Sequence, residues 1–110
     1  EAFGGKDRGP RPKPLVLSAL AGCTGMDVAS ILGKMKMPYD SFAIEVDGEL
    51  TDEHPKVYKT ITVRYIFTGN ELDRGKIEKA VNLSQDKYCG VSAMLGKTAE
   101  IKAEIITNDS

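Results

Sequence analysis

Residues 14–36 read PLVLSALAGCTGMDVASILGKMK and predict one long helix. Apolar side chains occur around nearly its whole circumference, which is typical of a helix that is buried on all sides. At about 1.5 Å per residue the helix would be roughly 33 Å long. Pro14 suits the first turn, where a missing N–H costs nothing, and Pro38 is expected to end the helix.

Small residues gather in the middle of this helix, around Cys23. Gly22 and Gly25 flank the cysteine, although a glycine inside a helix costs about 1 kcal/mol relative to alanine. Two such glycines indicate that another group approaches the backbone closely at this point. A second helix and a substrate both fit that interpretation.

The rest of the chain shows strand and helix patterns in turn. Residues 1–13 are rich in glycine, proline and charge and are expected to be extended. Alternating apolar residues predict strands, Asp73 is suited to be the N-cap of a second helix, and a short apolar run before Gly96 predicts a third. The expected ranges are strands at 42–47, 57–68 and 101–105, helices at 74–84 and 91–95, and a loop at 85–89.

This order predicts an α+β fold in a single domain, residues 1–110, with the helices packed against an antiparallel sheet. Three strands are few for a sheet that must cover so long an apolar helix. We therefore expect either that further strands precede residue 1 or that a second subunit covers the helix.

Composition limits the class of protein. Of the 110 residues, 41% are hydrophobic and 28% are charged, which is the balance of a soluble globular protein. A net charge of −1 provides no basic excess to neutralise phosphates, so nucleic acid is not an expected partner. No apolar run reaches the roughly 18 residues needed to span a bilayer, and no signal peptide is visible. We expect a cytoplasmic protein with no membrane partner, although the chain opens at Glu1 rather than at methionine.

Metal ligands are scarce in the sequence. There is no CxxC pair, and His54, the only histidine, lies in a polar turn where it is expected to be exposed. A zinc site built from this chain alone would be short of ligands, so we expect no metal and no bound cofactor. Two cysteines are also too few for the disulfide framework of a small secreted domain.

Cys23 and Cys89 are the candidate reactive residues. A cysteine inside a buried helix is often a small core residue, which is one interpretation of Cys23. Cys89 precedes a predicted helix, where a cysteine has better access and a lower pKa. Together they are the minimum set for a redox cycle in which one thiolate becomes a sulfenic acid and the second thiol condenses with it. Only tertiary structure could bring together two residues so far apart in the sequence.

One residue opposes the redox interpretation. Asp27 lies four residues after Cys23 on the same helix face, where a carboxylate would disfavour the thiolate. A cation must then compensate, and Asp27 could instead orient such a cation. The basic candidates lie near the N-terminus, where they could equally form a solvated patch: Lys6, Arg8, Arg11 and Lys13.

Three segments resemble the OsmC/Ohr family, the osmotically inducible protein C and organic hydroperoxide resistance proteins. They are PLVLSALAGCTGMDVASIL at 14–32, DEHPKVYKTITVRYIFTG at 52–69 and KIEKAVNLSQDKYCGVSAML at 76–95. The resemblance covers nearly the whole chain, about residues 9–107. It is nearest to OsmC-like proteins whose second cysteine motif has the form DKYC.

The resemblance implies an α+β domain that forms an intertwined homodimer, with long central helices between sheets built from both chains. It implies that Cys23, in the ALAGC motif, is the peroxidatic cysteine and that Cys89, in the KYC motif, is the resolving cysteine. The implied substrates are small organic hydroperoxides, with hydrogen peroxide usually poorer. The implied reductant is an external dithiol, such as a dihydrolipoyl group.

The sequence departs from the family pattern in two ways. Characterised members carry a β-hairpin before the first helix, with an arginine that activates the cysteine, and residue 1 falls after that hairpin. They also place a glutamate ten residues before the cysteine to hold the arginine, and here that position is Lys13. Two functions therefore stay open beside a hydroperoxide reductase. One is a non-catalytic dimeric stress protein, and the other is a redox sensor that forms the disulfide stoichiometrically.

Overall fold

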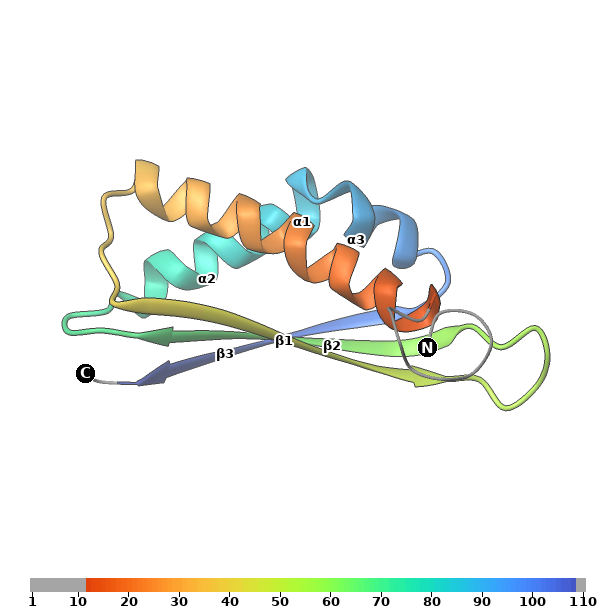
Figure 1. Cartoon of the computed structure of the whole chain (residues 1–110). Coiled ribbons are helices and arrows are strands. Elements are labelled where there is room, and N and C mark those ends of the chain that lie inside the picture. Colours follow the sequence, from red (N-terminus) through yellow and green to blue (C-terminus); the bar gives the residue numbers. More distant parts are fainter. Residues whose placement is uncertain (1–11, 109–110) are drawn as a thin grey trace.

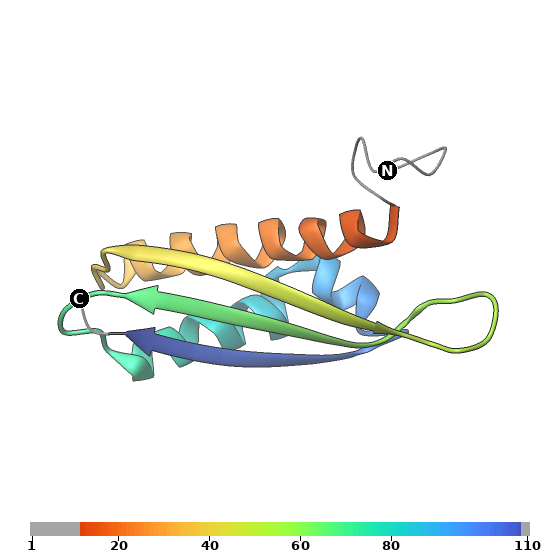
Figure 2. The ribbon, with the colours of Figure 1, turned by 60° about the horizontal axis from the view of Figure 1, so that its bottom comes forward.

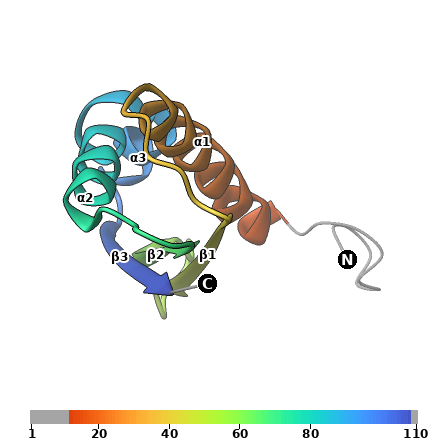
Figure 3. The ribbon, with the colours of Figure 1, turned by 90° about the vertical axis from the view of Figure 1, so that its left-hand side faces the viewer.

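The computed structural model of the chain describes residues 12–108. Its helices all lie on one face of a three-stranded sheet (Figures 1 and 3). This arrangement confirms the predicted α+β fold. The elements are, in order, α1 (Pro12–Lys34), β1 (Ser41–Leu50), β2 (Tyr58–Thr68), α2 (Arg74–Leu83), the π-helix η1 (Ser84–Tyr88), α3 (Gly90–Leu95) and β3 (Glu100–Asn108).

The sheet is mixed, so the expectation of an antiparallel sheet is wrong. β2 lies in the centre and pairs antiparallel with β1 and parallel with β3. Residues 69–99 contain α2, η1 and α3 and carry the chain back along the sheet, so β2 and β3 point the same way (Figure 2). A crossover of about a dozen residues or more is what a parallel pair requires, and this segment is long enough to form one.

The core lies between the sheet and the helices. The predicted inner face of β2 is confirmed, because every second residue from Ile61 to Phe67 is fully buried. α1 and α2 cover this face. The buried apolar side chains include Ile61, Val63, Tyr65 and Phe67 from β2, Leu20, Val28 and Leu32 from α1, and Ile77, Ala80 and Val81 from α2.

Charged side chains cross the outer face of the sheet. Arg64 on β2 forms ion pairs with Asp47 on β1 and with Glu104 on β3. These pairs are largely exposed to solvent, where such interactions contribute at most about 1 kcal/mol.

α1 is buried along one stripe only, so the expectation of a helix buried on all sides is wrong for the single chain. Its fully buried residues are Leu20, Thr24, Val28 and Leu32. Leu15 is 48% exposed and Met26 is 76% exposed. The helix is long and apolar enough to cross a membrane by length and composition alone, which inspection of the sequence did not recognise. Its buried stripe packs into the hydrophobic core between the helices and the sheet.

Both ends of α1 differ from the sequence-based expectation. The helix begins at Pro12, inside the segment expected to be extended, and it ends at Lys34, before Pro38. Lys36 adopts a left-handed conformation with φ of 59°. Its N–H donates to the Gly33 carbonyl at 3.1 Å, and such a left-handed residue is a common helix terminator.

One of the two glycines beside Cys23 makes the predicted close approach. A Cβ on Gly25 would lie 2.9 Å from Cδ1 of Ile44, so the missing side chain lets α1 pack closely on β1. Among the described residues, no atom lies within 4 Å of a Cβ on Gly22. Gly22 therefore faces open space in the single chain.

The turn before Cys89 is a π-helix, where a loop was expected. The Asp73 side chain caps α2 as predicted, accepting the Lys76 N–H at 3.2 Å, and α2 ends at Leu83. The chain then widens into η1, and the Cys89 N–H donates to the Ser84 carbonyl at 2.7 Å. Single π-turns of this kind occur often at functional sites.

Candidate functional site

The structure brings Cys23 and Cys89 together. Their sulfur atoms and a carboxylate oxygen of Asp27 all lie within 4.8 Å of one another. Both cysteines are free thiols. Cys23 is half-buried on α1, whereas Cys89 is 3% exposed and forms the N-cap of α3. The two elements are far apart in the sequence, so the fold alone creates this cluster.

The local structure fixes each of these side chains. Cys23 and Asp27 are one helical turn apart on α1, so both project from the same face. The Cys89 backbone is held by the last turn of η1, and its sulfur accepts the Ser92 N–H at 3.4 Å. The π-helix therefore sets where the second sulfur lies relative to α1.

A chain of buried hydroxyl groups ends on the Asp27 carboxylate. Ser84 donates to Asp27 at 3.1 Å, and Thr24 lies 2.7 Å from both the Ser84 and the Tyr65 hydroxyl oxygens. Because each hydroxyl has one hydrogen, Thr24 must donate to Ser84, and Tyr65 must donate to Thr24. Gln85 Nε2 completes the chain by donating to the Tyr65 oxygen at 2.6 Å. Each group therefore donates its hydrogen bond in the direction of Asp27, and the Asp27 carboxylate is the last acceptor of the chain.

Burial sets the electrostatics of the site. Burial raises the pKa of Cys89 above that of an ordinary thiol; the Ser92 side chain and backbone N–H partly oppose this shift, and the adjacent Cys23 adds to it. The expectation of a lower pKa at this helix start is therefore wrong, because burial outweighs the position at the helix start. Burial likewise raises the pKa of Tyr65, and its hydrogen bonds with Thr24 and Gln85 oppose this shift.

No cation among residues 12–108 pairs with the cluster. The hydrogen bond to Asp27 comes from Ser84, and that to the Cys89 sulfur comes from the Ser92 backbone. Lys13 is in the first turn of α1, ten residues before Cys23 and about 15 Å away along the helix axis. The other basic candidates, Lys6, Arg8 and Arg11, lie outside the described residues.

Three further residues with side chains suited to catalysis or binding lie away from the site or at its edge. His54 is exposed in its turn, as expected. Tyr88 is 55% exposed, with Lys87 Nζ 5.5 Å from its ring centroid, so it does not fill the core. Met26, one turn after Gly22 on α1, is exposed to solvent in the single chain. The sequence-based prediction did not include Thr24 and Ser84, the buried hydroxyls that lead to Asp27. The one indication in the sequence is that each is a polar residue at a helical position where burial is expected.

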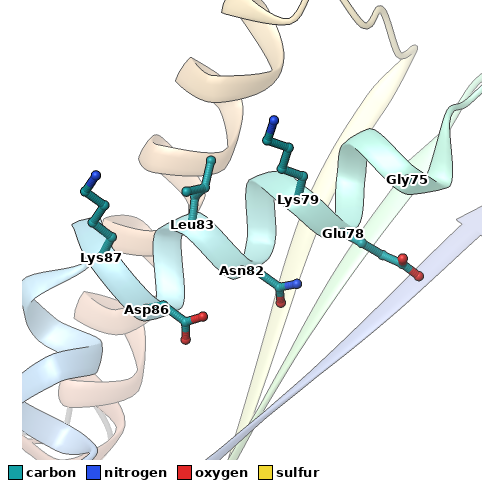
Figure 4. Close-up of a pocket in the computed structure, with 7 residues that line it drawn as sticks. All are labelled: Gly75, Glu78, Lys79, Asn82, Leu83, Asp86 and Lys87. Atoms are coloured by element: carbon teal, nitrogen blue, oxygen red, sulfur yellow. The ribbon is translucent and has the colours of Figure 1, made fainter.

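Two surface hollows lie near these elements. One, of about 660 Å³, follows α2 and η1 and holds neither cysteine. Its side chains point to two sides of the helix and do not converge on a common point (Figure 4). A second hollow, of about 570 Å³, reaches Asp27 and is also lined by Lys34, Lys79 and Tyr88. This second hollow opens Asp27 to solvent, and neither cysteine lines it.

Comparisons with known proteins concern the sequence and the fold of the chain. The sequence matches the profile of the OsmC-like protein family over residues 4–104. Protein YhfA of Escherichia coli (strain K12) is 36% identical over 95 residues, which cover 86% of this chain and 71% of that protein.

Solved structures share the fold. A crystal structure of a hypothetical protein from Aquifex aeolicus VF5 superposes with a TM-score of 0.89 and is 31% identical, covering 94% of this chain and 78% of the other. The organic hydroperoxide resistance protein OhrB of Bacillus subtilis superposes with a TM-score of 0.72 over 94% of this chain and 75% of its own. At 21% identity, the likeness to OhrB shows a common fold only.

Proposed function

The chain belongs to the OsmC-like protein family, and on this premise we propose that it reduces small organic hydroperoxides through Cys23 and Cys89. The observation that carries the proposal is the proximity of the two sulfurs, which lie within 4.8 Å of each other. A disulfide bond is about 2.05 Å long, so the sulfurs need to approach by less than about 3 Å, within reach of side-chain rotation. The shared fold with organic hydroperoxide resistance proteins supports the same chemistry.

The proposed cycle has three balanced steps. The Cys23 thiolate attacks one peroxide oxygen, the O–O bond breaks, and a proton converts the departing alkoxide to an alcohol. This leaves Cys23 as a sulfenic acid. The Cys89 thiol then displaces water from it to form the Cys23–Cys89 disulfide. An external dithiol, such as a dihydrolipoyl group, reduces the disulfide by thiol–disulfide exchange and becomes a disulfide itself.

The exposure of the two sulfurs supports these roles. Cys23 is half-buried and open to a small substrate, whereas Cys89 is 3% exposed. Burial also raises the pKa of Cys89, which makes it the weaker nucleophile of the pair toward peroxide. To attack the sulfenic acid, Cys89 must lose its proton, which the hydroxide released from the sulfenic acid can accept to form water.

A homodimer belongs to the same proposal. α1 exposes an apolar and small-residue stripe at helical spacing, and a second copy would cover it. This stripe comprises Leu15, Ala19, Gly22 and Met26. Covering Met26 would also place its side chain against the partner, where an apolar substrate pocket could form close to Cys23.

The carboxylate of Asp27 favours an alternative, a redox sensor. It lies within 4.8 Å of both sulfurs, with no paired cation among the described residues, and so disfavours the thiolate that attacks peroxide. A slow first step with no turnover is the behaviour of a sensor. The two functions differ in whether an added dithiol sustains the reaction.

Peroxide-driven loss of thiols tests the proposal. The reduced protein is mixed with one equivalent of cumene hydroperoxide, and free thiols, peroxide and intact mass are followed. We expect both thiols to disappear together, the mass of two hydrogens to be lost and the peroxide to be consumed. Added dihydrolipoamide should then sustain turnover, and persistence of both thiols would remove the redox function.

Two single substitutions distinguish the role of Cys23 from that of Cys89. Cys89→Ser should still consume one equivalent of peroxide and accumulate a sulfenic acid that dimedone traps. Cys23→Ser should consume none. Unchanged peroxide consumption in Cys23→Ser would favour the non-catalytic stress protein, and disulfide formation without turnover would favour the sensor.

A further inference from the structure

The cluster beside α1 has the ligand set of a metal site. Two cysteine sulfurs, from Cys23 and Cys89, and a carboxylate oxygen of Asp27 lie within 4.8 Å of one another. We propose that, in the reduced protein, these three residues bind a thiophilic divalent cation such as Zn²⁺. Counting only cysteines and histidines predicted too few ligands, and Asp27 supplies the third.

The distances fit a tetrahedral zinc site. Zn–S bonds are about 2.3 Å and Zn–O bonds about 2.0–2.2 Å, which places neighbouring ligand atoms about 3.5–3.8 Å apart. The three atoms therefore need to close by about 1 Å from their outer limit of 4.8 Å, which small side-chain rotations provide. Three protein ligands leave the fourth position to solvent.

The hydroxyl chain supplies the support that a metal-binding carboxylate needs. Ser84 is fully buried and donates to Oδ2 of Asp27 at 3.1 Å, with Thr24 and Tyr65 behind it. Hydrogen bonds to a ligating carboxylate fix its orientation and typically change metal affinity by about 10–100-fold. A carboxylate has enough lone pairs to accept from Ser84 and bind a cation together.

The charge of the cluster also favours a cation. Once a bound ion has displaced the thiol protons, two thiolates and a carboxylate would carry three negative charges, and no basic residue among residues 12–108 forms an ion pair with Asp27. A divalent cation offsets most of this charge and, as it binds, displaces the thiol protons. The hollow that reaches Asp27 opens this carboxylate to solvent, with Lys34 and Lys79 also in its lining.

Cobalt binding tests the site without peroxide. The full chain is reduced, stripped with EDTA and titrated anaerobically with Co²⁺, and then with Zn²⁺ against a chromophoric chelator. We expect thiolate-to-cobalt charge-transfer absorption that saturates at one ion per chain and is abolished by Zn²⁺. Protein alkylated with N-ethylmaleimide should show none of this absorption. Absence of the absorption from the unmodified protein would overturn the proposal.

A matched pair of variants tests the carboxylate. Asp27→Asn keeps both sulfurs and the side-chain size, and we expect its Zn²⁺ affinity to fall at least about tenfold. Asp86→Asn removes an exposed carboxylate from the neighbouring η1 and should bind as the unmodified chain does. Equal affinity in Asp27→Asn and Asp86→Asn would overturn the role of Asp27.

If Asp27→Asn does not fold, zinc-edge X-ray absorption of the unmodified protein shows whether both sulfurs bind the ion. Two sulfur ligands at about 2.3 Å together with lighter ligands support the site, and any other sulfur count overturns it. No peroxide enters any of these measurements. The metal site can therefore fail while the hydroperoxide reductase stands, and the reverse also holds.

Discussion

Ser84 donates a hydrogen bond of 3.1 Å to the carboxylate of Asp27, and this bond ties the π-helix η1 to the face of α1 that carries Cys23. η1 ends immediately before Cys89, so the same contact controls how the two sulfurs approach each other. A regular α-helical turn would place the Cys89 backbone differently relative to Ser84. The widened turn is therefore part of the site, and it tolerates little change.

Replacement of Ser84 by alanine should destabilise the protein by about 1–3 kcal/mol, because it leaves part-buried Asp27 and buried Thr24 each short of a hydrogen-bond partner. Urea denaturation followed by circular dichroism measures the change. Ser30→Ala, at an exposed position on the same helix α1, is the control and should stay within about 0.5 kcal/mol. Equal stabilities of the two variants would show that the hydroxyl chain contributes nothing to folding.

The two thiols should react with iodoacetamide at very different rates. Cys89 is 3% exposed, and burial raises its pKa, so at any given pH less of it is thiolate than in an ordinary cysteine. We expect Cys23 to be alkylated first, and the rate at Cys89 to rise only at a pH above the usual thiol range. Peptide mass spectrometry across a pH series measures both rates, and protein unfolded in urea, in which the difference should vanish, is the control. Faster alkylation of Cys89 in the folded protein would reverse the proposed roles.

Local patterns in the sequence predict local structure in this chain well. The alternation in β2 predicts its buried face, and Asp73 predicts the start of α2. The expected loop at 85–89 is a π-helix, because the hydrogen bond from the Cys89 N–H to the Ser84 carbonyl leaves no periodic signature in so short a segment.

Relations between distant segments were harder to predict. The parallel pairing of β3 depends on the length and path of the whole crossover, which single-strand patterns do not encode. The cluster of Cys23, Asp27 and Cys89 was only partly foreseen. Helical spacing predicts that Asp27 lies beside Cys23, but its hydrogen bond from Ser84 joins residues 57 positions apart. Such contacts follow from packing.

A charge on the open stripe of α1 should prevent dimer formation. Met26 is 76% exposed in the single chain, and in the proposed homodimer it is covered, so Met26→Glu would bury a carboxylate against apolar surface. Sedimentation analysis should give a dimer for the unmodified chain and a monomer for Met26→Glu. Lys79→Glu, on the exposed side of α2, should remain dimeric. A monomeric unmodified chain, or a dimeric Met26→Glu, would contradict this interface.

The close approach of α1 to β1 should appear as coupling between Gly25 and Ile44. A methyl group at position 25 would lie 2.9 Å from Cδ1 of Ile44, so in Gly25→Ala the Ile44 side chain must shift. Cδ1 is the far end of a flexible, half-buried side chain, so this shift costs little and should offset only part of the gain of about 1 kcal/mol in helix propensity. Ile44→Val removes Cδ1, and the double variant should show the full gain.

The control for this cycle is Gly33→Ala near the end of the same helix, where no described atom lies within 4 Å of the added Cβ. It should be neutral or slightly stabilising, because only the helix propensity changes. Urea denaturation of the four proteins in the cycle yields the coupling energy directly. A coupling energy near zero would mean that α1 and β1 are further apart at Gly25 than this packing requires, and the position of Cys23 above the sheet would have to be revised with it.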